Sequence, residues 1–214
     1  MKRKLKLIIV FIFIFLLIMY FGIEGKGFEN IDNDSLKFLS TYLDSFQKYL
    51  FTITIFVGLV IILVQVPFFN PEIKSRIKNN VFQYVWGKYL LIIIILCSYL
   101  LLSFFVVSFV FGYNNIFSIL SLPIFFRLFT FVLACFVFYT FIYFISSNQF
   151  LAISTVIASN FLLLIIINAI NFYLMNNTID DNTTIFILSL YSGVINVFGL
   201  TYLYFYMDKK ECLK

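Results

Sequence analysis

Six long apolar runs, joined by shorter polar segments, make up most of this 214-residue chain. The hydrocarbon core of a bilayer is about 30 Å thick and each helical residue adds about 1.5 Å, so a spanning helix needs about 20 residues. The runs do not alternate apolar and polar residues as the strands of a membrane barrel do. We therefore predict an all-α, polytopic membrane protein with a single domain and six transmembrane helices. The domain is residues 1–214, and the helices are residues 6–23, 49–66, 89–111, 119–144, 150–175 and 185–206.

The basic residues gather on one side of these predicted spans. Cytoplasmic loops of membrane proteins are enriched in Lys and Arg. When the first residues are placed in the cytoplasm, eleven of the fifteen Lys and Arg residues fall in cytoplasmic segments, three fall outside, and Arg127 lies within the fourth span. Both termini are therefore predicted to be cytoplasmic. This bias, together with the anionic lipids of the inner leaflet, explains the net charge of +5 without a nucleic-acid partner.

The composition excludes several classes of function. Hydrophobic residues make up 63% of the chain and charged residues only 12%, far from the balance of a soluble domain. The sequence contains no histidine, which excludes His-based metal centres and nucleophile–His pairs. It also contains no GxxxxGK[ST] loop, and all ten acidic residues lie in predicted loops or tails. We therefore expect a protein that is not an enzyme and has no cofactor or metal of its own, so that any ATP would be bound by a partner subunit.

The longest cytoplasmic segment, between the second and third spans, carries the clearest local signal. Asn70, Pro71 and Glu72 are a strong helix start, because Asn caps free amides, Pro has no amide to satisfy and Glu suits the positive end of the helix dipole. Apolar residues then recur at helical spacing beside a basic cluster. We predict an amphipathic helix from Pro71 to Trp86 that ends at Gly87, before the third span. It is either an anchor on the inner membrane surface or a docking element for a cytoplasmic motor.

Six spans with both ends inside, an acid near the start of this loop, a basic cluster, and Gly87, Lys88 and Tyr89 just before the third span resemble the membrane subunits of ABC-type-2 exporters. The likeness covers the topology of the whole chain, but the motifs are confined to this loop. In that family, the loop forms a coupling helix that sits in a groove of the ATPase subunit. The resemblance implies that the coupling residues here are Glu72, Lys74, Arg76, Lys78 and Lys88.

The resemblance also implies a function. The chain would be the permease half of an exporter, working with a cytoplasmic ABC ATPase subunit and with a second permease half, which is a copy of this chain or a different one. We expect an apolar or amphipathic substrate, such as an antimicrobial or surface-active peptide, because the spans are rich in aromatic residues and poor in polar ones. The alternative is a non-transporting immunity protein that binds a bacteriocin-like peptide in the bilayer, which does not require the capped basic helix. The abundance of Ile, Phe, Asn and Lys looks like that of an AT-rich bacterium, so we expect a multi-pass protein of a bacterial cell membrane.

Four polar residues within the spans are candidates for a translocation path. Arg127 is about 12 Å below the outer surface when residues are counted inward from Ile119. Its side chain either extends to the outer headgroups or faces a cavity between subunits, where it would pair with a carboxylate of the substrate or of a partner. Asn160, Asn168 and Asn171 fall within about 80° of one another on the fifth span, so this stripe must face protein or water. It either bonds neighbouring helices or lines the path. Its candidate partners on the last span are Ser192, Gly193 and Asn196.

The longest outer segment, residues 24–48, begins polar and then places leucines at helical spacing. Asp34 or Ser35 is suited to cap a helix there, and Asp44 and Lys48 form a favourable pair one turn apart. We predict a short amphipathic helix on the outer surface. It either leads into the second span or gates the outer mouth.

Overall fold

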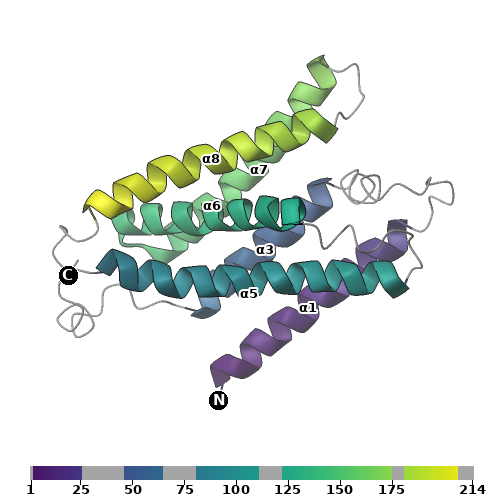
Figure 1. Ribbon diagram of the computed structural model, residues 1–214, viewed down its shortest axis with the longest axis horizontal. Coiled ribbons are helices and arrows are strands. Elements are labelled where there is room, and N and C mark those ends of the chain that lie inside the picture. Colours follow the sequence, from purple (N-terminus) through teal and green to yellow (C-terminus); the bar gives the residue numbers. More distant parts are fainter. Residues whose placement is uncertain (1, 26–45, 65–80, 111–121, 175–180, 207–214) are drawn as a thin grey trace.

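In the computed structural model, the described residues are 2–25, 46–64, 81–110, 122–174 and 181–206. These residues form six α-helices and no strand, which confirms the all-α prediction (Figure 1). The helices are α1 (Lys2–Gly25), α3 (Phe46–Val64), α5 (Val81–Val110), α6 (Leu122–Ser146), α7 (Gln149–Leu174) and α8 (Asp181–Tyr206). Each helix contains most of one apolar run, so the runs in the sequence are the helices of the fold.

Four of these helices are long and apolar enough to cross a membrane, which gives the chain the helices of a membrane protein. Their apolar stretches are Phe82–Val107, Phe125–Ser146, Gln149–Ile170 and Phe186–Tyr206. In α1 and α3, the described apolar stretches are shorter, at Leu5–Tyr20 and Thr52–Leu63. Six spans with both termini in the cytoplasm therefore stay a prediction.

The helix end predicted at Gly87 is wrong. α5 runs without interruption from Val81 to Val110, so the last residues of the predicted loop helix belong to the same helix as the third span. The Trp86 indole is buried against the rings of Phe82 and Tyr89. A glycine weakens a helix by only about 1 kcal/mol, and this packing on both sides of Gly87 outweighs that cost. The earlier part of the predicted loop helix, and the predicted outer helix up to residue 45, lie outside the described residues.

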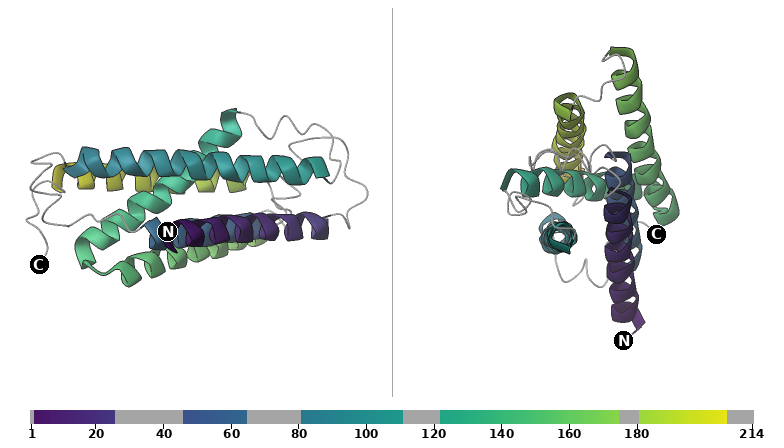
Figure 2. Two further views of the ribbon diagram at one scale, coloured as in Figure 1. Left: turned by 90° about the horizontal axis from the view of Figure 1, so that it is seen from below. Right: turned by 90° about the vertical axis from the view of Figure 1, so that its right-hand side faces the viewer.

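α6 is the central helix of the bundle. It packs most extensively against α8 and also contacts α7, α5 and α3, whereas α1 packs against α3 and α5 (Figures 1 and 2). α8 packs mainly on α6 and leaves most of its apolar surface exposed at the edge of the bundle. Exposed apolar side chains on α5, α7 and α8, such as Leu91, Ile165 and Phe198, form the surface expected to contact lipid.

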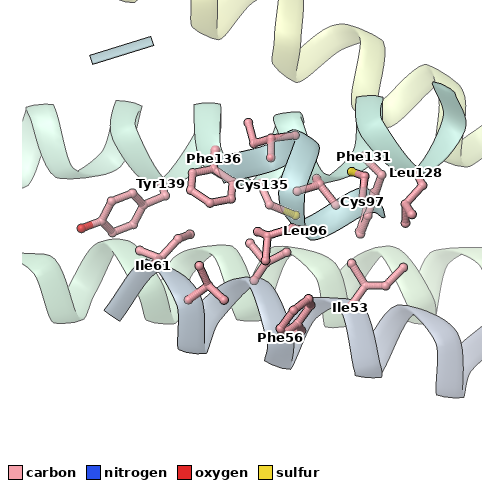
Figure 3. Close-up of a cluster of buried hydrophobic side chains, with 14 of the residues drawn as sticks. Ile53, Phe56, Ile61, Leu96, Cys97, Leu128, Phe131, Cys135, Phe136 and Tyr139 are labelled. Carbon is pink, nitrogen blue, oxygen red and sulfur yellow. The ribbon is translucent and has the colours of Figure 1, made fainter. Parts of the chain in front are cut away.

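The core lies where α3, α5 and α6 meet (Figure 3). Phe56 and Phe136 are completely buried there, and the Tyr89 and Phe136 rings pack edge to face with centroids 4.9 Å apart. On the other side of α6, Gly199 brings α8 so close that a Cβ atom at this position would lie 2.3 Å from Val137 Cγ1. Lipid tails are as apolar as these side chains, so close packing rather than the hydrophobic effect favours association of the helices.

A two-residue link joins α6 to α7. Ser147 has a φ of 56°, in the left-handed region, and its amide donates to the Tyr143 carbonyl at 2.8 Å, which ends α6. Asn148 caps α7, because its Oδ1 accepts from the amides of Phe150 and Leu151 at 3.0 and 3.2 Å. The link therefore turns the chain directly back into the bundle and fixes α6 and α7 as neighbours.

Candidate functional site

Asn160 of α7 is the centre of a buried polar network. The Asn160 side chain is 2% exposed, and its Nδ2 donates to Thr54 Oγ1 of α3 at 3.1 Å and to Cys135 Sγ of α6 at 3.5 Å. Its Oδ1 accepts from the hydroxyl of Tyr191 of α8 at 3.1 Å. One carboxamide therefore connects four helices that come from distant parts of the sequence.

Ser159 extends this network. Its Oγ lies 3.0 Å from the Tyr191 hydroxyl oxygen and donates to the Val156 carbonyl at 2.9 Å. We call Thr54, Cys135, Ser159, Asn160 and Tyr191 the Asn160 network. Both N–H groups and the oxygen of the carboxamide have partners, whereas an unsatisfied buried polar group costs about 1–3 kcal/mol. The network therefore stabilises this relative arrangement of the four helices over arrangements in which a helix is shifted or rotated.

The sequence identified Asn160 as a residue facing protein or water, but not its partners. The partner on α8 is Tyr191, whereas Ser192, Gly193 and Asn196 were the candidates. Asn196 bonds α6 instead, since its Nδ2 donates to the Thr130 carbonyl at 3.0 Å. The signal that points to Tyr191 is a hydroxyl in the middle of an apolar run. Cys135 gives no such signal, because a thiol is as common in apolar runs as an aliphatic side chain.

The three asparagines of the predicted stripe do not share one environment. Asn160 is buried, whereas Asn168, about two turns further along α7, is exposed. Asn171 belongs to α7, but its side chain lies outside the described residues. Bonding between helices is therefore what Asn160 does in this structure, and a translocation path along the stripe stays a prediction.

Arg127 is exposed on α6, five residues after the helix begins. Its guanidinium has no hydrogen bond or ion pair within the described part of the chain. The Thr130 hydroxyl donates to the Arg127 carbonyl at 2.9 Å. The structure thus places Arg127 on the outside of the bundle, away from the Asn160 network.

Lys88 is the one residue of the predicted coupling set that the structure describes. It is exposed on the first turns of α5, where Nζ donates to the Tyr84 hydroxyl and lies 4.2 Å from the centre of the Tyr84 ring. Cation–π contacts at exposed sites contribute about 0.5–1 kcal/mol, enough to orient the side chain along the helix. The other members, Glu72, Lys74, Arg76 and Lys78, lie outside the described residues.

An apolar groove of about 720 Å³ lies between α6 and α8. Phe141 and Tyr202, whose rings pack edge to face 5.1 Å apart, form its wall together with Phe198 and Gly199. Ligand pockets in proteins have volumes of about 300–1,000 Å³ and mostly apolar walls. The groove is large enough for a bulky apolar group or an acyl chain. Its apolar walls offer a polar solute few hydrogen-bonding groups.

Within the described residues, no three His, Cys, Asp or Glu side chains gather where they could hold a metal ion. The described helices pack mainly through apolar side chains, and the Asn160 network joins more of them than any other polar contact described above. No protein-family model, no curated protein and no solved structure matches this chain.

Proposed function

We propose that this protein is the membrane permease half of an ABC exporter. In this proposal, a separate cytoplasmic ATPase subunit binds and hydrolyses ATP, and the chain pairs with a second permease half, a copy of itself or a different protein. The observation that carries the proposal is that Val81 to Trp86, the last residues of the predicted coupling helix, belong to one helix long enough to cross the membrane.

α5 is suited to transmit a movement of that segment. It begins at Val81, shortly after Lys78, and its 30 residues extend about 45 Å without a break. A continuous helix moves as a rod, so a force on its inner end reaches its outer end. α5 packs against α1 and α6, and a shift of α5 therefore changes the packing of both helices.

The Asn160 network also supports the proposal. Its hydrogen bonds have narrow ranges of length and angle, so α3, α6, α7 and α8 either keep this arrangement or lose several bonds together. Switching proteins rely on such discrete arrangements. In the proposed cycle, ATP binding closes the ATPase pair, the coupling segment moves with it, and the spans exchange an inward opening for an outward one.

The substrate class follows from the surfaces available. The groove between α6 and α8 is apolar, and within the described helices the polar side chains are few and mostly bonded to backbone carbonyls or to one another. A sugar or an ion would find few hydrogen-bonding groups there. An apolar or amphipathic substrate, such as a surface-active or antimicrobial peptide, fits this chemistry.

The test is whether an ATPase stays bound to the tagged permease during purification from a host cell in mild detergent. We expect a subunit with a P-loop in equal amount, with a hydrolysis rate that rises when an amphipathic peptide is added. The alternative function, an immunity protein, predicts a different result: peptide binding and protection of cells with no ATPase and no need for ATP. A folded permease that retains no ATPase and still protects ATP-depleted cells would overturn the exporter proposal.

A further inference from the structure

Arg127 is separated from the polar link at the other end of α6 by one thickness of a bilayer core. The twenty residues from Arg127 to Ser146 extend about 30 Å along α6, the whole thickness of the hydrocarbon core. The polar link at Ser147 and Asn148 bounds the other end. With the link at one bilayer surface, Arg127 lies near the other surface, whereas counting inward from Ile119 gives a depth of about 12 Å.

The described side chains supply no carboxylate at this level. None of the side chains that the structure describes is acidic. The Asn196–Thr130 hydrogen bond and the Phe141–Tyr202 ring contact show that α6 and α8 run in the same direction and set their register. Arg127 therefore lies beside Gly193. Asp181, the first residue of α8, is about 18 Å further out, beyond the length of an arginine side chain.

Apolar rings precede and follow Arg127 on α6, and one of them faces outward. Phe126, the next residue in the chain, is 54% exposed, and the Phe125 and Phe129 rings stack with centroids 6.1 Å apart. The Thr130 hydroxyl is turned back to the Arg127 carbonyl and does not serve an outside ligand. A ligand at this face would meet a guanidinium and the exposed Phe126 ring at headgroup level, with the apolar length of α6 below them.

We propose that Arg127 binds the phosphate of an anionic phospholipid in the outer leaflet. The planar guanidinium presents two parallel N–H groups that match two phosphate oxygens, and the bond is stronger where water is partly excluded. The phosphate supplies the counter-ion that the described residues lack, and the exposed Phe126 ring contacts the same lipid. This site does not depend on whether the protein is an exporter.

The position next to Arg127 can carry a unique fluorescent reporter, because Trp86 is the only tryptophan of the chain. Trp86 Nε1 has no hydrogen-bond partner among the described residues, so Trp86→Phe leaves no acceptor unpaired. Phe126→Trp in that background then reports the lipid at this position. We would reconstitute this protein in two kinds of vesicle, one of brominated phosphatidylglycerol with plain phosphatidylcholine and the other of plain phosphatidylglycerol with brominated phosphatidylcholine. Quenching of the fluorescence of the Phe126→Trp reporter in each would then be measured. We expect phosphatidylglycerol to be preferred about tenfold, as for one charge-assisted hydrogen-bonded pair.

Three further variants in the same background separate the site from its surroundings. Arg127→Gln should abolish the preference for phosphatidylglycerol, and Arg127→Lys should keep part of it, since the charge remains but the planar fork is lost. Thr130→Val, which changes a neighbouring side chain without changing charge, should leave the preference intact. The proposal fails if Arg127→Gln keeps the full preference or if Thr130→Val removes it equally. If millimolar inorganic phosphate removes the preference, the ligand is a soluble phosphate and the lipid assignment is wrong.

Discussion

Asn160 Nδ2 and Thr54 Oγ1 lie 3.1 Å apart, although 106 residues separate them in the chain. Their hydrogen bond holds α7 to α3, and the same carboxamide also holds α6 and α8 through Cys135 and Tyr191. Such a contact forms only after all four helices have reached their places. The Asn160 network is therefore a sensitive probe of the final packing.

Asn160→Leu should destabilise the protein by about 1–2 kcal/mol. The substitution keeps a side chain of similar size but removes the Asn160 bonds to Thr54, Cys135 and Tyr191, and among the described residues Tyr191 keeps only Ser159, at 3.0 Å. A buried polar group that loses a partner costs more than the bond itself contributes. Unfolding of the purified protein by SDS measures the change. Asn168→Leu, the same substitution at an exposed position of the same helix, is the matched control and should change stability by less than half as much. Equal effects at the two positions would show that burial in the network is not the cause.

The two glycines of α8 should respond to alanine in opposite ways. A Cβ at position 199 would lie 2.3 Å from Val137 Cγ1, so Gly199→Ala should destabilise the protein by about 1–3 kcal/mol. A Cβ at Gly193 meets nothing within 4 Å, so Gly193→Ala should stabilise α8 by up to about 1 kcal/mol through helix propensity. The same SDS titration compares them. Adding Val137→Ala to Gly199→Ala should restore part of the loss, and a lack of rescue would place the strain elsewhere.

Reversing the charges of the coupling segment should uncouple the permease without unfolding it. Exposed charges contribute only about 0–1 kcal/mol to stability, whereas a reversed charge in a docking groove opposes its partner at a cost of several kcal/mol. We expect the double variant Arg76→Glu, Lys78→Glu to lose its co-purifying ATPase, or to keep it with hydrolysis that no longer responds to substrate.

Lys6→Glu is the control for that experiment. Lys6 is exposed and is predicted to lie on the cytoplasmic side, as Arg76 and Lys78 are, but it is not one of the predicted coupling residues. It should retain the ATPase. If the double variant binds the ATPase and exports normally, the assignment of Arg76 and Lys78 to coupling is wrong.

The predicted orientation can be tested with single cysteines. Asn30→Cys and Asp181→Cys should react with an impermeant thiol reagent in intact cells, and Lys78→Cys should react only after the cells are opened, because eleven basic residues lie on the predicted inner side and three on the outer. Cys97 and Cys135 are buried, so with Cys212→Ser the background should be low. Labelling of position 78 from outside would reverse the orientation.

The helices could be predicted from the sequence, because length and apolarity alone decide them. The rotation of each helix could not. Nearly every face of α5, α6 and α7 carries Ile, Leu or Phe, so no apolar stripe tells which face is inside. Asn160 was found because an amide in an apolar run must have a partner. Cys135 was missed, and Gly87 was taken as a helix end although Phe82, Trp86 and Tyr89 pack against one another at helical spacing on either side of it.

The link at Ser147 and Asn148 has a consequence for how any motion of this protein can be observed. The last residue of α6 and the first of α7 are three Cα–Cα steps apart, about 11 Å at most, so these two helix ends cannot separate, whatever the other helices do. A pair of spin labels placed on these two ends would keep one distance throughout a working cycle. The α6–α7 hairpin therefore provides a reference distance within the molecule, against which displacements of α5 and α8 can be measured.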